Sequence, residues 1–321
     1  MQAIHIAGYG GTEVLELVDA PDPKPKAGEV VIRSRAASVN PRDWMIRSGR
    51  YPFRWMLPKL PFVLGSDVSG VVGAVGEGVD GFVPGEPVAA MVPSSDGFGA
   101  YAEQVAVRAT SVVPKPATVS FEAAAAVPLA GLTALQAIRD EGRLRPGQRV
   151  VVAGASGGVG HFGVQIARLL GAAEVVGVCS AANVDFVRDL GCSQVIDYRQ
   201  ERYEDKLRGV DLIFDAVGRT GFARARRALT PRGTYVSTVP GGALIAQIAR
   251  TRLWPWGQRA AFVGVRSRGA DLATLMRWME EGRLRATIDQ TRPLDRVREL
   301  HEHSRSFRTR GKNLISFPDS P

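Results

Sequence analysis

The chain contains a glycine-rich segment whose spacing suits the binding of a dinucleotide pyrophosphate. It reads GASGGVG over residues 154–160 and follows an apolar run, Arg149–Ala153, that is expected to be a buried strand. A helix is expected from about Gly158 to Leu170, because apolar residues recur there at helical spacing. Pyrophosphate needs a tight turn, close backbone approach and free N–H groups at a helix N-terminus. Gly157 and Gly160 match the second and third glycines of that fingerprint, so the segment predicts a dinucleotide-binding loop.

The end of the next strand, expected at Glu174–Cys179, indicates which dinucleotide binds. An acidic residue there would bind a ribose 2′-hydroxyl and repel a 2′-phosphate. The sequence instead continues through Ser180 and Asn183, with no acidic residue before Asp185. Because small polar side chains can donate hydrogen bonds to a phosphate, NADPH is favoured over NADH. Ser180 also has an interpretation as the cap of the next helix, and the two roles are compatible.

Strands and helices alternate from about residue 122 to residue 286. This alternation is typical of a parallel sheet covered on both faces. Residues 1–121 instead read as short apolar runs broken by glycine and proline turns, which predicts a compact β-rich domain. The last residues, 287–321, return to strand and helix fragments and are expected to complete that first domain.

Composition excludes several protein classes. At 321 residues, with 23% charged and 45% hydrophobic residues, the chain suits two ordinary globular domains. Cys179 and Cys192 are too few for a disulfide framework or a four-thiolate zinc site, and are expected to be small buried residues. The two longest uncharged stretches are too short or too rich in glycine to span a bilayer. We expect no membrane partner, no secretory signal and a cytoplasmic location.

The charge balance raises a second hypothesis. The net charge is +9, and residues 283–312 hold nine basic residues against four acidic ones. A basic surface attracts anions such as nucleic acid. These charges lack the regular interleaving of aromatic residues that a single-strand stacking platform needs. Nucleic-acid binding is therefore kept as an alternative and not as the expected function.

Short motifs are spread over nearly the whole chain. They are VNPRD at 39–43, RSGRY at 47–51, LGSDVSG at 64–70, GAYAE at 99–103, LAGLTA at 129–134, the glycine loop, VIDY at 195–198, DAVG at 215–218 and GK at 311–312. Together they resemble the motifs of the medium-chain dehydrogenase/reductase superfamily, in its zinc-independent quinone oxidoreductase branch.

The resemblance implies an α/β protein of two domains. A GroES-like β-rich catalytic domain would cover residues 1–121, completed by 287–321, and a Rossmann NADP-binding domain would cover 122–286. The family also implies an active-site cleft between the domains, and homodimers joined through the cofactor domains are common in this branch.

The zinc-bearing relatives in the superfamily carry a catalytic cysteine near position 43 and a Gly-His-Glu motif. This chain has Gly65-Ser66-Asp67 in the second place, and no cysteine precedes Cys179. We therefore expect no catalytic zinc.

The resemblance also implies which residues contact the ligands. It places Asn40 and Tyr51 near the nicotinamide and the substrate. The predicted cofactor-binding residues are Thr133, Ser156, Gly157, Gly158, Val159, Ser180, Asn183, Tyr198, Val217, Phe262 and Lys312. Relatives often have lysine where this chain has Asn183, so the preference for NADPH would depend on nearby arginines.

Without a metal to polarise an oxygen, the expected chemistry is hydride transfer to an electron-poor acceptor, a quinone or an α,β-unsaturated carbonyl. Tyr51 is the predicted proton donor or oxyanion partner, with Asn40 positioning and Asp43 orienting. Asp43 has a second interpretation, as a surface residue at a helix start or a partner for Arg47. The alternatives to a reductase are a nucleic-acid-binding module and a catalytically silent NADPH-binding scaffold.

Other features of the sequence have less direct functional interpretations. His161 is expected to pack or cap within its helix, and His301 and His303 lie on different helix faces, the wrong spacing for a shared metal. Residues 254–257, WPWG, are either an aromatic lid over substrate or a dimer contact. Substrate choice is expected to depend on loops at 50–62 and 240–260.

Overall fold

The computed structural model describes residues 1–93, 97–254 and 256–318, which fall into two compact units. Unit 1 comprises Met1–Leu132 and Arg266–Pro321, and unit 2 comprises Thr133–Val265. Compared with the boundaries expected from the sequence, residues 122–132 and 266–286 belong to unit 1. The reason is packing within that unit: Ser267 donates its hydroxyl to the carbonyl of Met91 at 2.8 Å.

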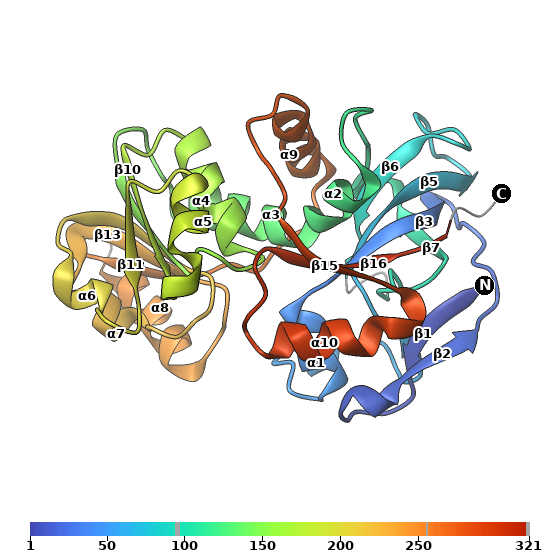
Figure 1. The fold of residues 1–321 in the computed structure, drawn as a ribbon, viewed down its shortest axis with the longest axis horizontal. Helices are drawn as coiled ribbons and strands as arrows, with labels where there is room; N and C mark the ends of the chain where they lie inside the picture. Colours follow the sequence, from blue (N-terminus) through green and yellow to red (C-terminus); the bar gives the residue numbers. More distant parts are fainter. Residues whose placement is uncertain (94–96, 255, 319–321) are drawn as a thin grey trace. The chain divides into compact units, whose positions relative to one another are not determined.

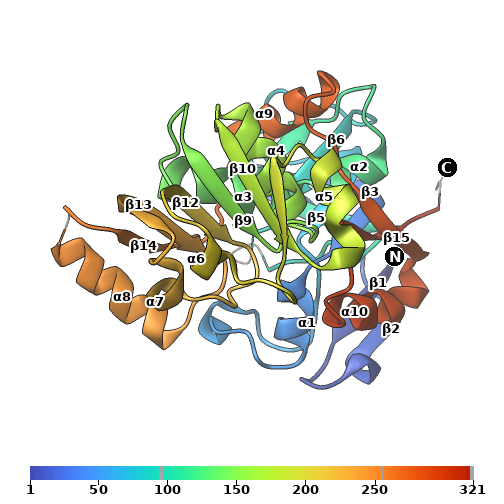
Figure 2. The same cartoon turned by 60° about the vertical axis from the view of Figure 1, so that its left-hand side comes forward.

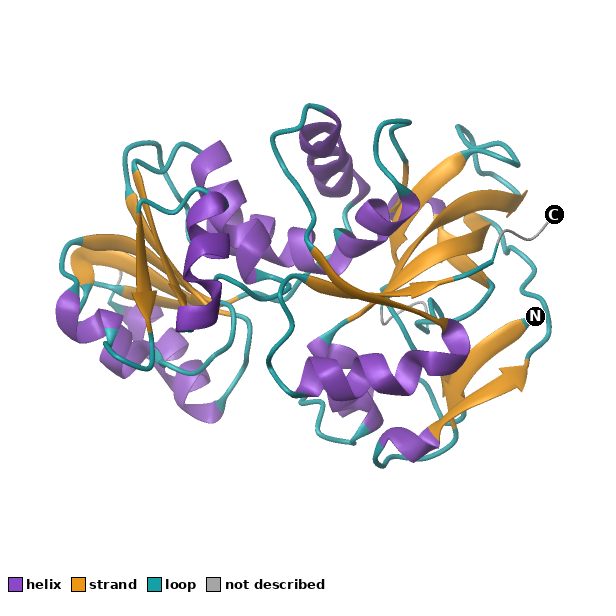
Figure 3. Ribbon diagram, viewed as in Figure 1, coloured by secondary structure: helices purple, strands orange, loops and turns teal. Residues whose placement is uncertain are grey.

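Unit 1 is dominated by antiparallel strands (Figures 1 and 3). A three-stranded sheet has the order β2-β1-β4, and a seven-stranded sheet has the order β15-β16-β3-β5-β6-β8 with β7 paired to β3. The strands are β1 (Gln2–Ile6), β2 (Leu15–Asp19), β3 (Glu29–Val39), β4 (Phe62–Val63), β5 (Asp67–Val75), β6 (Pro87–Met91), β7 (Gln104–Arg108), β8 (Val112–Pro114), β15 (Ile288–Pro293) and β16 (Lys312–Ser316). The helices are α1 (Pro41–Arg47), α2 (Phe121–Ala126), α9 (Gly269–Glu280) and α10 (Val297–Arg305). The β-rich character predicted for the first domain is confirmed.

The long strand β3 sets the register of the elements that carry polar residues. It pairs with β5 so that Ser38 lies opposite Asp67, and with β16 so that Val39 lies opposite Asn313. Helix α1 begins directly after β3, because Asn40 occupies the N-cap and the proline that follows stands at the first helical position. The end of β3, the start of β5 and the start of β16 therefore lie together.

Unit 2 is a six-stranded parallel sheet of order β11-β10-β9-β12-β13-β14. Its strands are β9 (Arg149–Ala153), β10 (Glu174–Cys179), β11 (Gln194–Asp197), β12 (Val210–Asp215), β13 (Leu229–Ser237) and β14 (Arg259–Phe262). Its helices are α4 (Gly160–Leu169), α5 (Val184–Asp189), α6 (Tyr203–Lys206), α7 (Phe222–Ala225) and α8 (Gly242–Leu253), and α3 (Pro128–Gln136) runs into it from unit 1. Helices cover both faces of the sheet (Figure 2). This is the doubly wound arrangement predicted from the alternation of elements.

The helical segment that enters unit 2 is divided into α2 and α3 at Pro128, which has no N–H to continue the first helix. Helix α7 ends at Ala225, and Leu229 already belongs to β13. Residues 240–260 were expected to be a loop, but they contain the twelve-residue helix α8.

Unit 2 has an apolar core between its sheet and helices α6, α7 and α8, to which Leu244 and Ile248 of α8 contribute. No helix in the described residues combines the length and the apolarity that crossing a bilayer would require.

Candidate functional site

The glycine segment forms a tight turn between β9 and α4. Gly154 adopts a φ of +77°, a conformation that other residues rarely take. A Cβ atom at Gly160 would lie 2.0 Å from the carbonyl oxygen of Gly154, so only glycine fits at the start of α4. A Cβ at Gly157 would meet the same oxygen at 3.4 Å, an ordinary contact. Gly160 therefore closes the turn, while Gly157 leaves the backbone open on its outer side.

This turn lies where the strand order of the sheet reverses. β9 pairs with β10 on one side and with β12 on the other, and the loops after β9 and β12 meet there, since a Cβ at Gly154 would lie 2.8 Å from Val217 Cγ1. Ligands of open α/β sheets bind in the crevice at such a switch point. Ser156, Gly157, Gly158 and Val159 are all half-buried and so remain accessible. A pyrophosphate fits here, because a helix N-terminus presents N–H groups to it.

Side chains from three successive loops meet beside this turn. Asn183 donates from Nδ2 to the hydroxyl oxygen of Ser156 at 3.2 Å and to that of Ser180 at 3.4 Å. The Ser180 hydroxyl makes no capping bond to the short helical turn at 181–183, so it serves this contact instead. Tyr198 donates its main-chain N–H to Cys179 at 3.1 Å, which brings it next to Ser180. Its ring is half-exposed and lies 6.0 Å from the Arg199 guanidinium.

Asp215 fixes the loop that follows β12. One carboxylate oxygen accepts the N–H groups of Val217 and Gly218, and the other accepts from Thr220 and from the Tyr235 hydroxyl at 2.8 Å. This holds Val217 in place next to the glycine turn. Phe262 ends β14 at the same carboxyl edge of the sheet, where it pairs in register with Ser237.

Within unit 1, a buried polar cluster joins four elements. We call Asn40, Asp43, Asp67, Tyr101 and Lys312 the polar cluster. Asn40 donates from Nδ2 to Asp67 Oδ2 at 2.9 Å and accepts from Lys312 Nζ at 2.5 Å. Asp43 Oδ2 accepts the Asn40 main-chain N–H and the Tyr101 hydroxyl, both at 2.8 Å. The register of β3 with β5 and β16 produces this convergence.

Burial controls the protonation of these groups. It raises the pKa of Asp43 to about 6, although Arg42, the Asn40 N–H and the Tyr101 hydroxyl act in the opposite direction. It also raises the pKa of Tyr101 and lowers the pKa of Lys312. Lys312 Nζ lies 3.6 Å from Asp67 Oδ2, so an ammonium group balances a carboxylate inside the fold. The expectation that Asp43 is a surface residue is wrong, because its exposed fraction is 0%.

Tyr51 lies apart from the polar cluster in sequence and in contacts. Its half-buried ring packs against an apolar core of unit 1 and makes an edge contact with Phe53, with centroids 5.7 Å apart. Its hydroxyl has no hydrogen-bond partner among the described residues. This leaves an O–H donor free to bind a ligand oxygen.

The remaining histidines and cysteines are structural. His161 is buried within α4, with Nδ1 3.0 Å from the Gly157 oxygen, as expected for a packing residue. His301 is buried against Tyr101, while His303 reaches Asp289 at 2.7 Å. Burial raises the pKa of Cys179 to about 11 and that of Cys192 to about 12, so both thiols are inert. In the described part of the chain, no group of three or more acidic, histidine or cysteine side chains could hold a metal ion.

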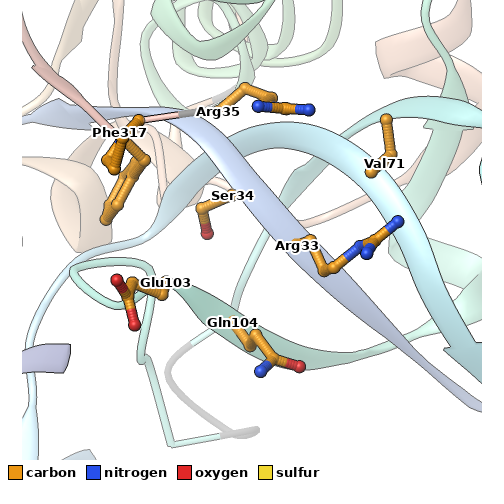
Figure 4. Close-up of a pocket in the computed structure, with 8 residues that line it drawn as sticks. Arg33, Ser34, Arg35, Val71, Glu103, Gln104 and Phe317 are labelled. Atoms are coloured by element: carbon orange, nitrogen blue, oxygen red, sulfur yellow. The ribbon is translucent and has the colours of Figure 1, made fainter. Parts of the chain in front are cut away.

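A pocket elsewhere in unit 1 shares no residue with the polar cluster. It lies on β3, β5 and β7 (Figure 4) and is lined by Arg33, Ser34, Arg35, Val71, Glu103, Gln104, Phe317 and Pro318. Its charges are mixed, and Glu103 already accepts the N–H of Gln2 at 2.7 Å. We assign no ligand to it.

Comparison with known proteins places this chain in a family. Residues 26–117 match the alcohol dehydrogenase GroES-like domain, and residues 190–315 match the zinc-binding dehydrogenase family. A chloroplastic quinone oxidoreductase of Triphysaria versicolor is 32% identical over 98% of both chains. The chain belongs to the medium-chain dehydrogenase/reductase superfamily of oxidoreductases, in its quinone oxidoreductase-like branch.

Solved structures agree with this placement. The quinone oxidoreductase of Coxiella burnetii superposes with a TM-score of 0.92 at 31% identity, covering 99% of each chain. The Escherichia coli quinone oxidoreductase, whose structure was determined in complex with NADPH, gives a TM-score of 0.84 at 28% identity over 99% of this chain and 100% of that one. The resemblance to the superfamily and to its quinone oxidoreductase branch, inferred from the motifs, is confirmed.

Sequence reasoning missed three residues of the unit 1 site. Asp67 and Tyr101 lie in motifs that were used for the resemblance, yet neither was assigned a role, and His301 was considered only as a metal ligand. Their contacts are made across more than twenty residues of sequence each, as in the 200-residue separation of Tyr101 and His301. The available signal was a polar residue at the end of an otherwise apolar strand, because a polar group buried there needs a hydrogen-bond partner.

Proposed function

We propose that this protein is a zinc-independent, NADPH-dependent oxidoreductase that delivers hydride to a quinone or an α,β-unsaturated carbonyl. The observation that carries the proposal is the glycine turn at residues 154–160, placed at the switch point of a six-stranded parallel sheet. Family membership adds support, since the relative from Escherichia coli binds NADPH.

The residues around the turn fit a nicotinamide dinucleotide. Ser156, Gly157, Gly158 and Val159 would hold the pyrophosphate, and Val217 and Phe262 lie at the same edge of the sheet. Ser180, Asn183 and Tyr198 would surround the adenosine ribose, with Arg199 supplying positive charge for a 2′-phosphate. Thr133, which is buried near the start of unit 2, is the remaining proposed cofactor contact of that unit. When bound, the reduced dinucleotide supplies the hydride.

In unit 1, Tyr51 and the polar cluster would act on the substrate. Hydride addition to an enone leaves an enolate, which Tyr51 would protonate or stabilise through its unpaired hydroxyl. The side chain of Asn40 is held by Asp67 and Lys312, and Asp43 fixes the start of α1. Asn40 and Asp43 would therefore orient groups that contact the ligand. Lys312 would act on the cofactor indirectly, because it holds the side-chain amide of Asn40.

Zinc independence is supported by the engagement of the buried carboxylates. Asp67 Oδ1 accepts the Leu129 N–H at 2.7 Å, and its Oδ2 accepts from Ser38 and Asn40. The nearby positive charge is the Lys312 ammonium. A zinc ion would have to displace these donors, and oxygen-only ligands suit it poorly.

We further propose a homodimer joined through unit 2. β14 is an end strand of the sheet as described, and a second copy that paired with this edge would continue the sheet across the two subunits. Light scattering would test this, and the mass of a dimer is expected.

We also propose a cytoplasmic location, which cell fractionation would test.

The function is tested by following anaerobic NADPH and NADH consumption with a panel of quinones and enones, using protein whose metal content has been measured. Rapid NADPH oxidation with one acceptor class, in metal-free protein, is expected. Tight NADPH binding without turnover would favour the silent scaffold. Salt-sensitive RNA binding that NADPH displaces would favour the nucleic-acid alternative.

A further inference from the structure

Arg42, in helix α1 of unit 1, is a cation that the fold leaves largely unpaired. Its side chain is half-buried, and its one hydrogen bond to the described residues runs from Nη2 to the hydroxyl oxygen of Ser66. Nε is buried without a partner, and Nη1 also makes no hydrogen bond within the described part of the chain. A guanidinium group carries five N–H donors, so most of those of Arg42 are unused.

Two buried residues fix the position of this guanidinium. Ser66 is 0% exposed and holds Nη2, and the guanidinium carbon lies 5.1 Å from the centroid of the Phe98 ring. Arginine interacts favourably with the face of an aromatic ring, and this contact leaves its N–H groups free to bind other groups. Nη1 is not enclosed as Nε is, so a ligand oxygen can reach it. Arg42 therefore presents a fixed and accessible donor.

The backbone of Phe98 has a conformation that aromatic residues rarely adopt. Its φ is +65°, in the left-handed region, although its ring is buried and stacks on Phe62 with centroids 6.1 Å apart. Strain of this kind persists where the surrounding structure enforces it, and it is concentrated at ligand-binding sites. The strained residue places its ring against Arg42 and within the apolar core on which Tyr51 packs.

The carboxylates near Arg42 do not pair with it. Asp67 is paired with Lys312, whose Nζ lies 3.6 Å from Oδ2. Burial raises the pKa of Asp43 to about 6, although the charge of Arg42 acts in the opposite direction, and the two side chains form no ion pair. Within the described ranges, no other acidic side chain forms an ion pair with Arg42 either. Because a half-buried charge without a partner is unfavourable, this position favours an anionic ligand.

We propose that Arg42 binds a carboxylate carried by the acceptor, so that the substrate is an enone or a quinone with an acidic substituent. The fork formed by Nη1 and Nη2 suits the two oxygens of a carboxylate. The free hydroxyl of Tyr51 would bind the carbonyl oxygen of the same acceptor. This inference rests on the proposed function, which it deepens by naming the class of acceptor.

A neutral carbonyl oxygen is the competing ligand for Arg42. It would balance the charge only while negative charge develops during the reaction, whereas a carboxylate balances it as soon as the acceptor is bound. The unpaired charge of the ligand-free protein therefore favours the carboxylate. The two cases differ in kinetics, because binding that is equal in the ground and transition states changes KM, while an interaction made only in the transition state changes kcat.

The test compares benzoylacrylate, an enone that carries a carboxylate, with its neutral methyl ester. In both, the hydride of NADPH adds to the carbon β to the ketone and a proton adds to the α carbon, which gives the saturated ketone and NADP⁺. The unaltered protein should show a KM at least about tenfold lower for the acid than for the ester. Arg42→Gln should raise the KM of the acid by about tenfold or more, with little change in kcat, and leave the KM of the ester unchanged.

Two further variants control this result. Arg42→Lys keeps the positive charge but loses the fork, so it should retain part of the preference for the acid. Arg33→Gln removes an exposed arginine of the same unit and should change neither KM. Circular dichroism and thermal unfolding show whether each variant is folded.

Direct binding separates this inference from the proposed function. Benzoylpropionate lacks the reactive carbon–carbon double bond, so calorimetric titration measures its binding without turnover. Tighter binding of this acid than of its methyl ester, with the difference lost in Arg42→Gln, supports the carboxylate site even if no acceptor is reduced. In that case the proposed function alone fails.

The inference is overturned if the unaltered protein binds the acid and the ester equally well. It is also overturned if Arg42→Gln weakens the reaction of both acceptors equally, which would assign Arg42 to their shared carbonyl oxygen. An equal loss in Arg33→Gln would show a general effect of net charge and would likewise contradict a site at Arg42.

Discussion

The Nζ atom of Lys312 lies 2.5 Å from Oδ1 of Asn40, a hydrogen bond between residues 272 positions apart. It connects the first residue of β16 to the N-cap of α1. The same ammonium group lies 3.6 Å from Asp67, so one buried cation holds both the amide and a carboxylate. The orientation of Asn40 therefore depends on the last strand of unit 1.

Replacing Lys312 by Met should destabilise the protein strongly. It leaves Asp67 buried without its cation, and breaking one partner of a buried pair typically costs about 3–5 kcal/mol. The free energy of unfolding, measured in urea, gives the loss. Lys59→Met, at an exposed position, is the control and should change it by less than about 0.5 kcal/mol. Equal stability of the two variants would contradict the role given to Lys312.

Acid stability should depend on His301. Burial and Arg47 lower its pKa to about 3, below the ordinary value near 6.5. As the pH falls below 6.5, His301 is protonated in the unfolded chain while its buried ring stays neutral in the folded protein. The free energy of unfolding therefore falls toward pH 3 by up to about 1.4 kcal/mol per pH unit. Asp43, whose pKa is raised to about 6, acts in the opposite direction, since below pH 6 its folded form takes up a proton.

His301→Gln should therefore flatten the decline of stability between pH 6.5 and pH 4 in urea titrations, relative to the unaltered protein. His303→Gln is the control on the same helix. Its ring is partly exposed and lies against Asp289, outside the buried contact with Tyr101, so this variant should keep the original slope. If both variants showed the same slope as the unaltered protein, buried His301 would not govern acid stability.

The two loop glycines should have separable effects. Gly160→Ala places a methyl group 2.0 Å from the Gly154 carbonyl, which should disrupt the turn and lower both the melting temperature and NADPH affinity. Gly157→Ala meets only an ordinary 3.4 Å contact, so the fold should be retained. Its methyl group would still obstruct the pyrophosphate, and NADPH affinity should fall. Thermal unfolding combined with calorimetric titration separates the two, and unchanged affinity in both would count against the loop.

Cofactor preference should respond to charge beside Tyr198. Arg199→Gln is expected to weaken NADPH binding by about tenfold, equivalent to ~1.4 kcal/mol, without changing NADH binding. Asn183→Lys should act in the opposite direction and strengthen NADPH binding. Arg188→Gln, on an exposed side chain that pairs with Asp185, is the control. Equal losses for both dinucleotides in Arg199→Gln would mean that this arginine does not contact the 2′-phosphate.

Tyr51→Phe should reduce enone turnover because it removes only the hydroxyl. General acid catalysis typically contributes about 100-fold or more, so kcat/KM should fall by that order while the fold is kept. Tyr9→Phe, a partly exposed tyrosine of the same unit, is the matched control and should leave turnover unchanged. Unchanged turnover in Tyr51→Phe would show that this hydroxyl is not essential and that another group donates the proton.

The sequence by itself determined the features that depend on neighbouring residues. The glycine turn, the strands on either side of it and the alternation that produces a parallel sheet are local patterns, and they identified the fold and the family. Helix α8 was not predicted because Gly241 and Gly242 stand at its N-cap and its first position. In addition, Ile245 and Leu253 on its exposed side are apolar where a surface helix is usually polar.

Only the tertiary structure decided which distant polar groups meet. Asp43 follows Asn40 in a helix-start pattern that is equally common on surfaces, and its burial results from Tyr101 and the packed strands around it. The convergence of Lys312, Asn40 and Asp67 depends on the pairing of β3 with β5 and β16. Strand register is set by the summed packing of whole sheets, so no local pattern could have specified it.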